Sequence, residues 1–125
     1  MTRNCTILLV DDEPLILMDL EFAAEDRGCT TLSASNVATA LQHIERADPA
    51  VCCAVLDVSL LDGENCLPIA RALDQRGIPY VIHSGDLDRQ DERIRSLNAP
   101  RAAKPCPSDK VVRMALDHAG LSDLV

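Results

Sequence analysis

Residues 6–14 read TILLVDDEP, an apolar run that meets three acidic residues and a proline. Similar junctions follow along the chain, because AVL ends at Asp57, YVIH ends at Ser84 and RAA ends at Lys104. Short apolar runs are typical of buried strands, and parallel strands place their carboxyl ends at one sheet edge, where open α/β sheets bind ligands. The sequence therefore predicts one site that is built from several strand ends.

Strands and helices are expected to alternate along the whole chain. The expected strands are Thr6–Val10, Cys29–Ser33, Val51–Leu56, Pro79–His83 and Arg101–Ala103. Apolar residues at helical spacing, with proline near helix starts and glycine after helix ends, indicate the helices between them. The expected helices are Pro14–Arg27 before Gly28, Asn36–Arg46 after Ser35 as N-cap, Asn65–Gln75 before Gly77, and a last one that Ser108 can cap. Such alternation implies βαβ crossovers, a parallel sheet and a three-layer (βα)₅ architecture.

Length and composition place the chain among ordinary single-domain proteins. Its 125 residues are 47% apolar, which predicts one domain over residues 1–125 with a real core. No apolar stretch reaches the roughly 20 residues that span a membrane, and the N-terminus does not resemble a signal peptide, so a cytoplasmic location is expected. A formal net charge of −8 argues against nucleic-acid binding and favours Mg²⁺ or a basic partner surface.

Six cysteines lie mostly in or beside apolar runs, and reduced thiols are expected because secretory features are missing. The sequence has no CxxC motif and no cysteine and histidine spacing of a metal site, which argues against structural zinc or redox chemistry. The adjacent Cys52 and Cys53 are expected to point to opposite faces of a strand.

The acidic residues at the strand ends predict a cation site. Carboxylates about 4 Å apart repel by roughly 4 kcal/mol per pair at an effective dielectric of about 20, so a cluster of them needs a cation or protons. Hard oxygen ligands indicate Mg²⁺. Each of these residues also has a purely structural alternative role. Asp11 or Asp12 could be a helix N-cap before Pro14, Ser84 could be a turn residue, and Lys104 could be a solvated amine. His83 is expected to be a packed strand residue rather than a catalyst.

Taken together, these residues resemble the receiver domain of two-component response regulators, of the stand-alone type, over essentially the entire chain. The acid pair, the later aspartate, the hydroxyl residue and the Lys-Pro pair occur in the family's order and at about its spacing. The resemblance implies a flavodoxin-like fold with a parallel sheet of order 2-1-3-4-5. One position departs from the common pattern, because Arg101 stands where receivers usually carry an aromatic residue.

The resemblance also implies a role for each acidic residue. Asp57 is the implied phosphoacceptor, which takes a phosphoryl group from a phosphohistidine. Asp12 is implied to bind Mg²⁺ directly and Asp11 through water. Asp57 and the backbone carbonyl of Ser59 complete the protein ligands.

Further implied roles fall on residues after the fourth and fifth strands. Lys104 supplies its ammonium group to a phosphoryl oxygen or, without phosphate, to Asp57, and the following bond to Pro105 is cis in most of the family. Ser84 is the implied switch hydroxyl. The charged stretch Asp86–Ser96 is expected to be a short, weakly packed helix that responds to the switch, with Arg101 as a hypothetical partner for its acids.

The expected function is that of a two-component receiver that signals by protein contact. Its implied partners are a sensor histidine kinase or a histidine phosphotransfer protein and an unidentified output protein, with the receiver itself a monomer or weak dimer. No enzyme activity is expected apart from self-phosphotransfer and autodephosphorylation. Two alternatives stay open, a binding module that acts irrespective of phosphorylation and a small hydrolase that uses Asp57 as its nucleophile.

Overall fold

The computed structural model describes residues 5–47, 50–60, 63–85, 96–97 and 99–121. Strands and helices alternate as expected up to β4. The strands are β1 (Thr6–Val10), β2 (Thr30–Ala34), β3 (Cys53–Asp57), β4 (Tyr80–Ser84) and β5 (Arg101–Ala103). The helices are α1 (Pro14–Asp26), α2 (Val37–Arg46), α3 (Leu67–Gln75) and α5 (Ser108–His118). The helix expected within Asp86–Ser96 falls almost wholly outside the described residues.

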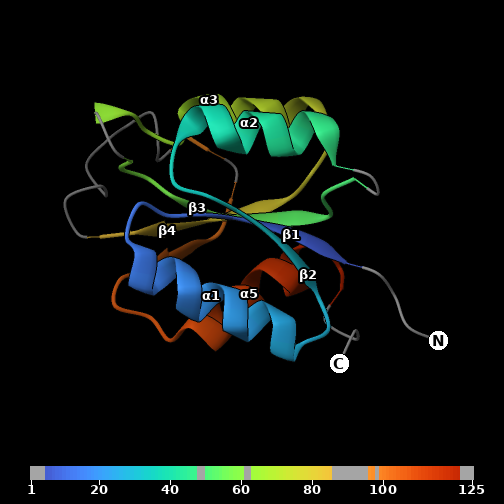
Figure 1. Cartoon of the computed structure of the whole chain (residues 1–125), viewed down its shortest axis with the longest axis vertical. Coiled ribbons are helices and arrows are strands. Elements are labelled where there is room, and N and C mark those ends of the chain that lie inside the picture. The colour runs from blue at the N-terminus through green and yellow to red at the C-terminus, as the bar shows by residue number, and fades with distance from the viewer. Residues whose placement is uncertain (1–4, 48–49, 61–62, 86–95, 98, 122–125) are drawn as a thin grey trace.

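The five strands form one parallel sheet in the order β2-β1-β3-β4-β5, which confirms the predicted topology. Figure 1 shows α2 and α3 on one face of this sheet and α1 and α5 on the other. The three expected layers are therefore present. Because all strands run in the same direction, their carboxyl ends gather at one edge, and the residues after them can form one site.

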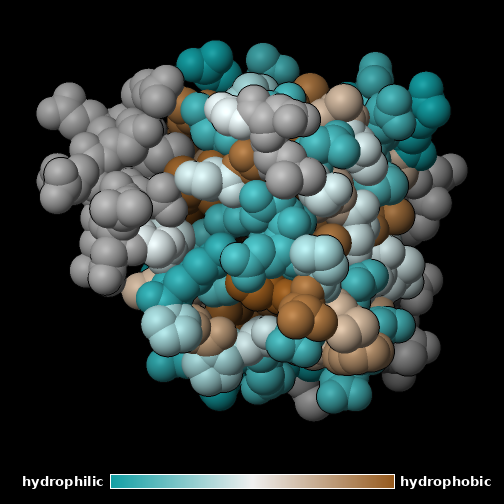
Figure 2. All heavy atoms as spheres, turned by 60° about the vertical axis from the view of Figure 1, so that its left-hand side comes forward, coloured by the Kyte–Doolittle hydropathy of each residue, from teal (hydrophilic) through white to brown (hydrophobic). Residues whose placement is uncertain are grey.

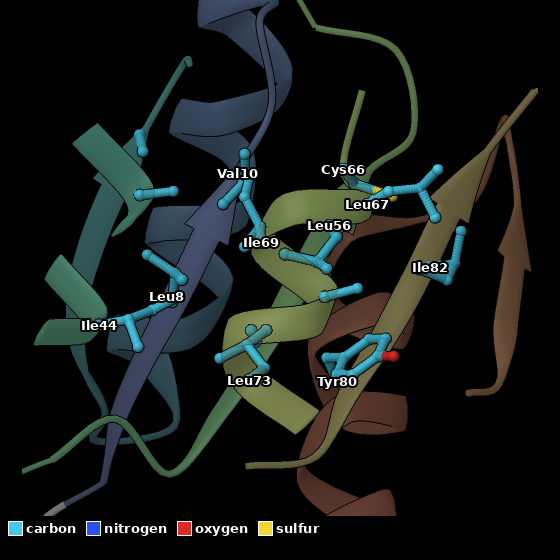
Figure 3. Packing of buried hydrophobic residues seen from close by; sticks show 14 of the residues in the cluster. Leu8, Val10, Ile44, Leu56, Cys66, Leu67, Ile69, Leu73, Tyr80 and Ile82 are labelled. Carbon is cyan, nitrogen blue, oxygen red and sulfur yellow. The ribbon is translucent and has the colours of Figure 1, made fainter. Parts of the chain in front are cut away.

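The core explains why β1, β3 and β4 are mostly apolar. Every residue of these strands is buried, because helices cover both faces of the sheet. Successive side chains point to opposite faces. Figure 3 shows Leu8, Leu56 and Ile82 packing with helix residues such as Ile69 on the α2 and α3 side. Their neighbours in sequence pack against α1 and α5.

Several predicted boundaries differ from the structure by one or two residues. β2, β3 and β4 each end one residue later than predicted. Asp57 and Ser84 are therefore the last residues of their strands rather than the residues that follow them. The N-cap of α2 is Asn36, not Ser35, and its side chain accepts a hydrogen bond of 2.8 Å from the Thr39 amide. Ser108 is the first residue of α5 and follows Pro107 as N-cap. Short polar side chains at adjacent positions compete for such caps, and sequence alone does not decide between them.

The cysteines are where the prediction is wrong. Cys5 and Cys52 form a disulfide, whereas Cys29, Cys53, Cys66 and Cys106 are free. Cys52 precedes β3, so the strand alternation does not apply to it, and its sulfur lies on the same side as that of Cys53. The sulfur atoms of Cys5, Cys52 and Cys53 lie within 4.8 Å of one another. The pairing of β1 with β3 brings them together, which short-range spacing could not reveal.

Helix length also bears on the membrane prediction. Within the part of the chain that the structure describes, no helix combines the length and the apolar character needed to cross a lipid bilayer.

Candidate functional site

Three carboxylates meet at the carboxyl edge of the sheet. Asp57 is the last residue of β3, and Asp11 and Asp12 follow β1, its neighbour in the sheet. One carboxylate oxygen from each residue lies within 4.8 Å of the others. Asp11 is 1% exposed and Asp57 is 4% exposed, whereas Asp12 is half-buried. The structure thus brings together the acidic residues that the sequence singled out.

The backbone after β1 holds Asp11 in place. Its amide donates to the carbonyl of Ala34 at 3.1 Å, which ties it to the end of β2. Its Oδ1 accepts a hydrogen bond of 2.9 Å from the Glu13 amide. Glu13, rather than Asp11 or Asp12, is the N-cap of α1 and makes no side-chain cap bond. The N-cap alternative for the two aspartates is therefore wrong, and their carboxylates remain available to the site.

Lys104 places a cation among these acids. Its Nζ donates to Asp57 Oδ1 at 3.0 Å and lies 3.5 Å from Asp11 Oδ2. The Lys104 amide donates to the Ser84 carbonyl at 2.8 Å, so the lysine continues the pairing of β5 with β4. The Lys104–Pro105 bond is cis, as the resemblance implied. The alternative of a solvated surface amine is wrong, because only 24% of the Lys104 side chain is exposed.

Burial sets the protonation of this cluster. The pKa of Asp57 is raised to about 7, chiefly by burial and then by the charge of Asp11, while Lys104 acts to lower it. Burial also raises the pKa of Asp11. For Lys104, burial disfavours the charge, but Asp57 and Asp11 outweigh it and raise the pKa. The positive charge of Lys104 therefore does not fully offset the cost of burying the negative charges of Asp11 and Asp57 near neutral pH.

The donor set fits a hard divalent cation. The three carboxylates supply oxygen ligands, which Mg²⁺ prefers. The buried Oδ2 of Asp11 accepts no hydrogen bond from the described residues, although it faces Lys104. A bound cation would favour the charged forms of Asp11 and Asp57, which burial disfavours.

Ser84 and Ser59 also lie at this edge. Ser84 ends β4 and is 4% exposed, one position beyond His83, which pairs with Asp57 in the sheet register. Ser59 is exposed and forms an antiparallel bridge with Asn65, which folds back the loop after β3. Both residues are thus near the strand end that carries Asp57, as the sequence predicted.

Sequence reasoning assigned no role to the surroundings of His83. The residue is packed in its strand, as expected, and 4% exposed. However, neither of its ring nitrogens has a hydrogen-bond partner among the described residues. A cavity of about 330 Å³ lies beside it, and its other walls are Ile16, Asp19, Lys104, Pro105, Cys106 and Ser108. Burial first, and then the charge of Lys104, lowers the pKa of His83 to about 4, so the ring is neutral at physiological pH.

The lowered pKa of His83 predicts acid sensitivity. The unfolded state binds a proton at His83 below about pH 6.5, whereas the folded state does not until about pH 4, so stability falls as pH drops between these values. We expect the wild type to lose about 3 kcal/mol relative to His83→Leu over this range. Urea unfolding of both proteins from pH 4 to pH 7.5 measures the difference. A difference that stays constant with pH would contradict the prediction.

An exposed apolar surface on α1 was also not predicted. Leu15, Met18 and Phe22 are 72%, 41% and 59% exposed, and their spacing of three and four residues places them along one side of the helix. Figure 2 turns the carboxyl edge of the sheet toward the viewer and shows hydrophobic side chains gathered below a band of hydrophilic ones. α1 begins at Pro14, two positions after Asp12, so the start of this α1 surface lies near the site.

Comparison with solved structures identifies many similar folds. SdrG from Sphingomonas melonis Fr1, known from a solution structure, is 39% identical to this chain, with a TM-score of 0.76. The match covers 95% of this chain and 98% of SdrG. A response regulator receiver protein from Sinorhizobium medicae WSM419 is 23% identical, with a TM-score of 0.80 over 97% of this chain and 98% of that chain.

A third solved structure extends the fold comparison. The response regulator receiver domain protein (CheY-like) from Methanospirillum hungatei JF-1 is 20% identical, with a TM-score of 0.79 over 97% of this chain and 98% of that chain. Neither a protein-family model nor a curated protein matches the sequence. The three solved structures thus match this chain over nearly their full length, and SdrG also shares 39% of its residues with this chain.

Proposed function

This chain belongs to the response regulator receiver family, and we infer its function from that membership. We propose that Asp57 accepts a phosphoryl group from a phosphohistidine of a partner protein. One observation carries the proposal. The buried Asp57 carboxylate lies 3.0 Å from Lys104 Nζ and beside two further carboxylates at the edge of the sheet. A carboxylate nucleophile, a fixed ammonium group and a set of oxygen ligands are the parts that phosphoryl transfer needs.

The proposed transfer follows from these positions. An Asp57 carboxylate oxygen attacks phosphorus, the bond from phosphorus to the histidine nitrogen breaks, and the imidazole leaves with the bonding electrons. Lys104 moves its hydrogen bond from Asp57 to a phosphoryl oxygen and stabilises the negative charge there. We propose that Asp11, Asp12, Asp57 and the Ser59 carbonyl hold Mg²⁺, which neutralises charge on the phosphoryl oxygens when bound.

We propose that Ser84 reports the modified state. Its hydroxyl can donate to a phosphoryl oxygen on Asp57, because the two residues end adjacent strands. The backbone at Gly85, which follows, would move with it. The segment from residue 86 to 95 that follows in sequence lies outside the described residues, and so do the acids proposed as partners of Arg101.

Protein contact is the proposed output, from a single domain that acts in the cytoplasm as a monomer or weak dimer. Receiver domains in general interact with histidine kinases or phosphotransfer proteins. The exposed Leu15, Met18 and Phe22 supply an apolar surface next to the Asp57 site, where a partner that delivers a phosphoryl group has to dock. The proposed chemistry is limited to self-phosphotransfer and autodephosphorylation, without turnover of a metabolite.

Intact-mass spectrometry after incubation with acetyl phosphate and Mg²⁺ tests the proposal. We expect one phosphoryl adduct on the wild type, none on Asp57→Ala, and none when the metal is chelated. Asp117→Ala is the matched control, because it removes an exposed aspartate near the end of α5 that is not part of the acidic cluster, and it should leave the adduct unchanged.

Two other results would redirect the interpretation. Absence of an adduct on folded wild-type protein, together with failure to bind beryllofluoride, would contradict the proposal and favour a binding module that acts irrespective of phosphorylation. Turnover of generic phosphoesters that depends on Asp57 would favour the hydrolase.

A further inference from the structure

A group of sulfur atoms lies at the edge of the sheet opposite the carboxylates. Cys5 directly precedes β1, Cys52 directly precedes β3, and Cys53 is the first residue of β3. These strands are neighbours in register, with Ile7 opposite Cys53. The three sulfurs lie within 4.8 Å of one another, and the Cα atoms of Cys5 and Cys52 are 6.1 Å apart. This Cα separation is within the range that a disulfide spans without backbone movement.

We propose that Cys5 and Cys52 are a reversible redox pair, whose disulfide links the start of β1 to the start of β3 and stabilises the fold. The structure contains the oxidised form of the pair. It also contains the acceptor for the reduced form, because Cys52 Sγ lies 3.2 Å from the Thr6 carbonyl oxygen. A Cys52 thiol can therefore donate a hydrogen bond without rearrangement, so that neither state leaves this sulfur without an interaction.

Burial decides which of the three sulfurs reacts first. Cys52 is half-buried, whereas Cys5 is 2% exposed and Cys53 is fully buried. Burial raises the pKa of the Cys53 thiol to about 12, with a smaller contribution from Cys29, so Cys53 forms little thiolate. The Cys52 thiolate is therefore the group that reacts with a disulfide from solvent. Cys5 then pairs with Cys52, and Cys53 stays reduced.

The reaction is thiol–disulfide exchange with a small disulfide such as oxidised glutathione. The Cys52 thiolate attacks one glutathione sulfur, which forms a mixed disulfide and releases one glutathione thiolate. The Cys5 thiolate then attacks Cys52 Sγ and displaces the second glutathione thiolate. Two protein thiols lose two electrons, one glutathione disulfide gains them, and the two thiol protons pass to the released thiolates. Reduced glutathione reverses both steps.

The expected consequence is a change in stability. The two cysteines are 47 positions apart, and closing a loop of that length restricts the unfolded chain substantially. We expect the melting temperature of the oxidised protein to exceed that of the reduced protein by at least about 5 °C. The strands separate the pair from the carboxylates, so the proposal is independent of phosphorylation.

The test equilibrates the full chain in glutathione buffers of different redox poise, stops exchange with acid, and then alkylates the free thiols with N-ethylmaleimide in denaturant at neutral pH. Intact mass and peptide mapping should show one intramolecular Cys5–Cys52 disulfide in oxidising buffer and six alkylated thiols in reducing buffer. Cys52→Ala should abolish both the disulfide and the redox dependence of the melting temperature. Cys106→Ala, which removes another half-buried cysteine, should retain both.

Each variant is compared with itself in the two buffers, so a general loss of stability in Cys52→Ala does not affect the result. Six alkylated thiols at every poise would overturn the proposal. So would pairing through Cys106 or between two copies of the chain, or a redox-dependent melting shift that persists in Cys52→Ala.

Discussion

Replacing Asp57 with asparagine is expected to stabilise the metal-free protein at neutral pH by about 2 kcal/mol, although it removes the proposed phosphoacceptor. Burial and the neighbouring Asp11 raise the pKa of Asp57 from 3.8 to about 7. The folded state thus binds this proton more tightly than the unfolded state. The stabilisation of the folded state by this proton is complete below about pH 3.8 and disappears as pH rises through 7. Asparagine keeps the shape and removes the ionisation, while Lys104 retains Asp11 as a partner at 3.5 Å.

Urea unfolding in the presence of a chelator measures this effect from pH 4 to pH 8. The advantage of Asp57→Asn over the wild type should grow with pH, and the control Asp117→Asn should show no such trend. Adding Mg²⁺ should stabilise the wild type and not Asp57→Asn, because ligands stabilise the state that binds them. A variant that is less stable than the wild type at pH 8 in chelator would contradict the account of the buried acids.

Replacing Lys104 with methionine is expected to have the opposite effect, a loss of about 3 kcal/mol at pH 7.5 without metal. Methionine retains much of the apolar stem but removes the charge that lies 3.0 Å from Asp57 and 3.5 Å from Asp11. Two buried carboxylates then lack their cation. The loss should shrink as pH falls, because protonation of the acids removes the need for it.

A double-mutant cycle with Asp57→Asn separates this interaction from changes in packing. Lys104→Met should cost less in the Asp57→Asn background, since only Asp11 then loses its partner. Chemical unfolding of the four proteins at pH 7.5 in chelator gives the coupling energy. Equal costs in both backgrounds would mean that the Lys104 stem, rather than its charge, stabilises the fold. Lys110→Met serves as the control for removing an exposed lysine.

The sequence predicted the order of the elements well because local patterns carry that information. Residues 7–10 are apolar at every position, which indicates a strand covered on both faces, and the structure buries them together with Thr6. The strand-end argument correctly predicted that Asp11, Asp12, Asp57 and Lys104 meet. It depends only on the strands being parallel, not on their detailed packing. The chemical roles of these residues stay predictions, and the family resemblance supplied the strand order.

By itself, the sequence determined which segments form strands and helices and which chemical groups reach the carboxyl edge, because periodicity and capping act over a few neighbouring residues. Only the tertiary structure decided the environment of each group. It joined Cys5 to Cys52 across β1 and β3, and it buried His83 without a hydrogen-bond partner. It also raised the pKa of Asp57 to about 7, chiefly through burial. Burial, register and desolvation depend on segments far apart in the chain, so their effects on reactivity appear only when those segments pack together.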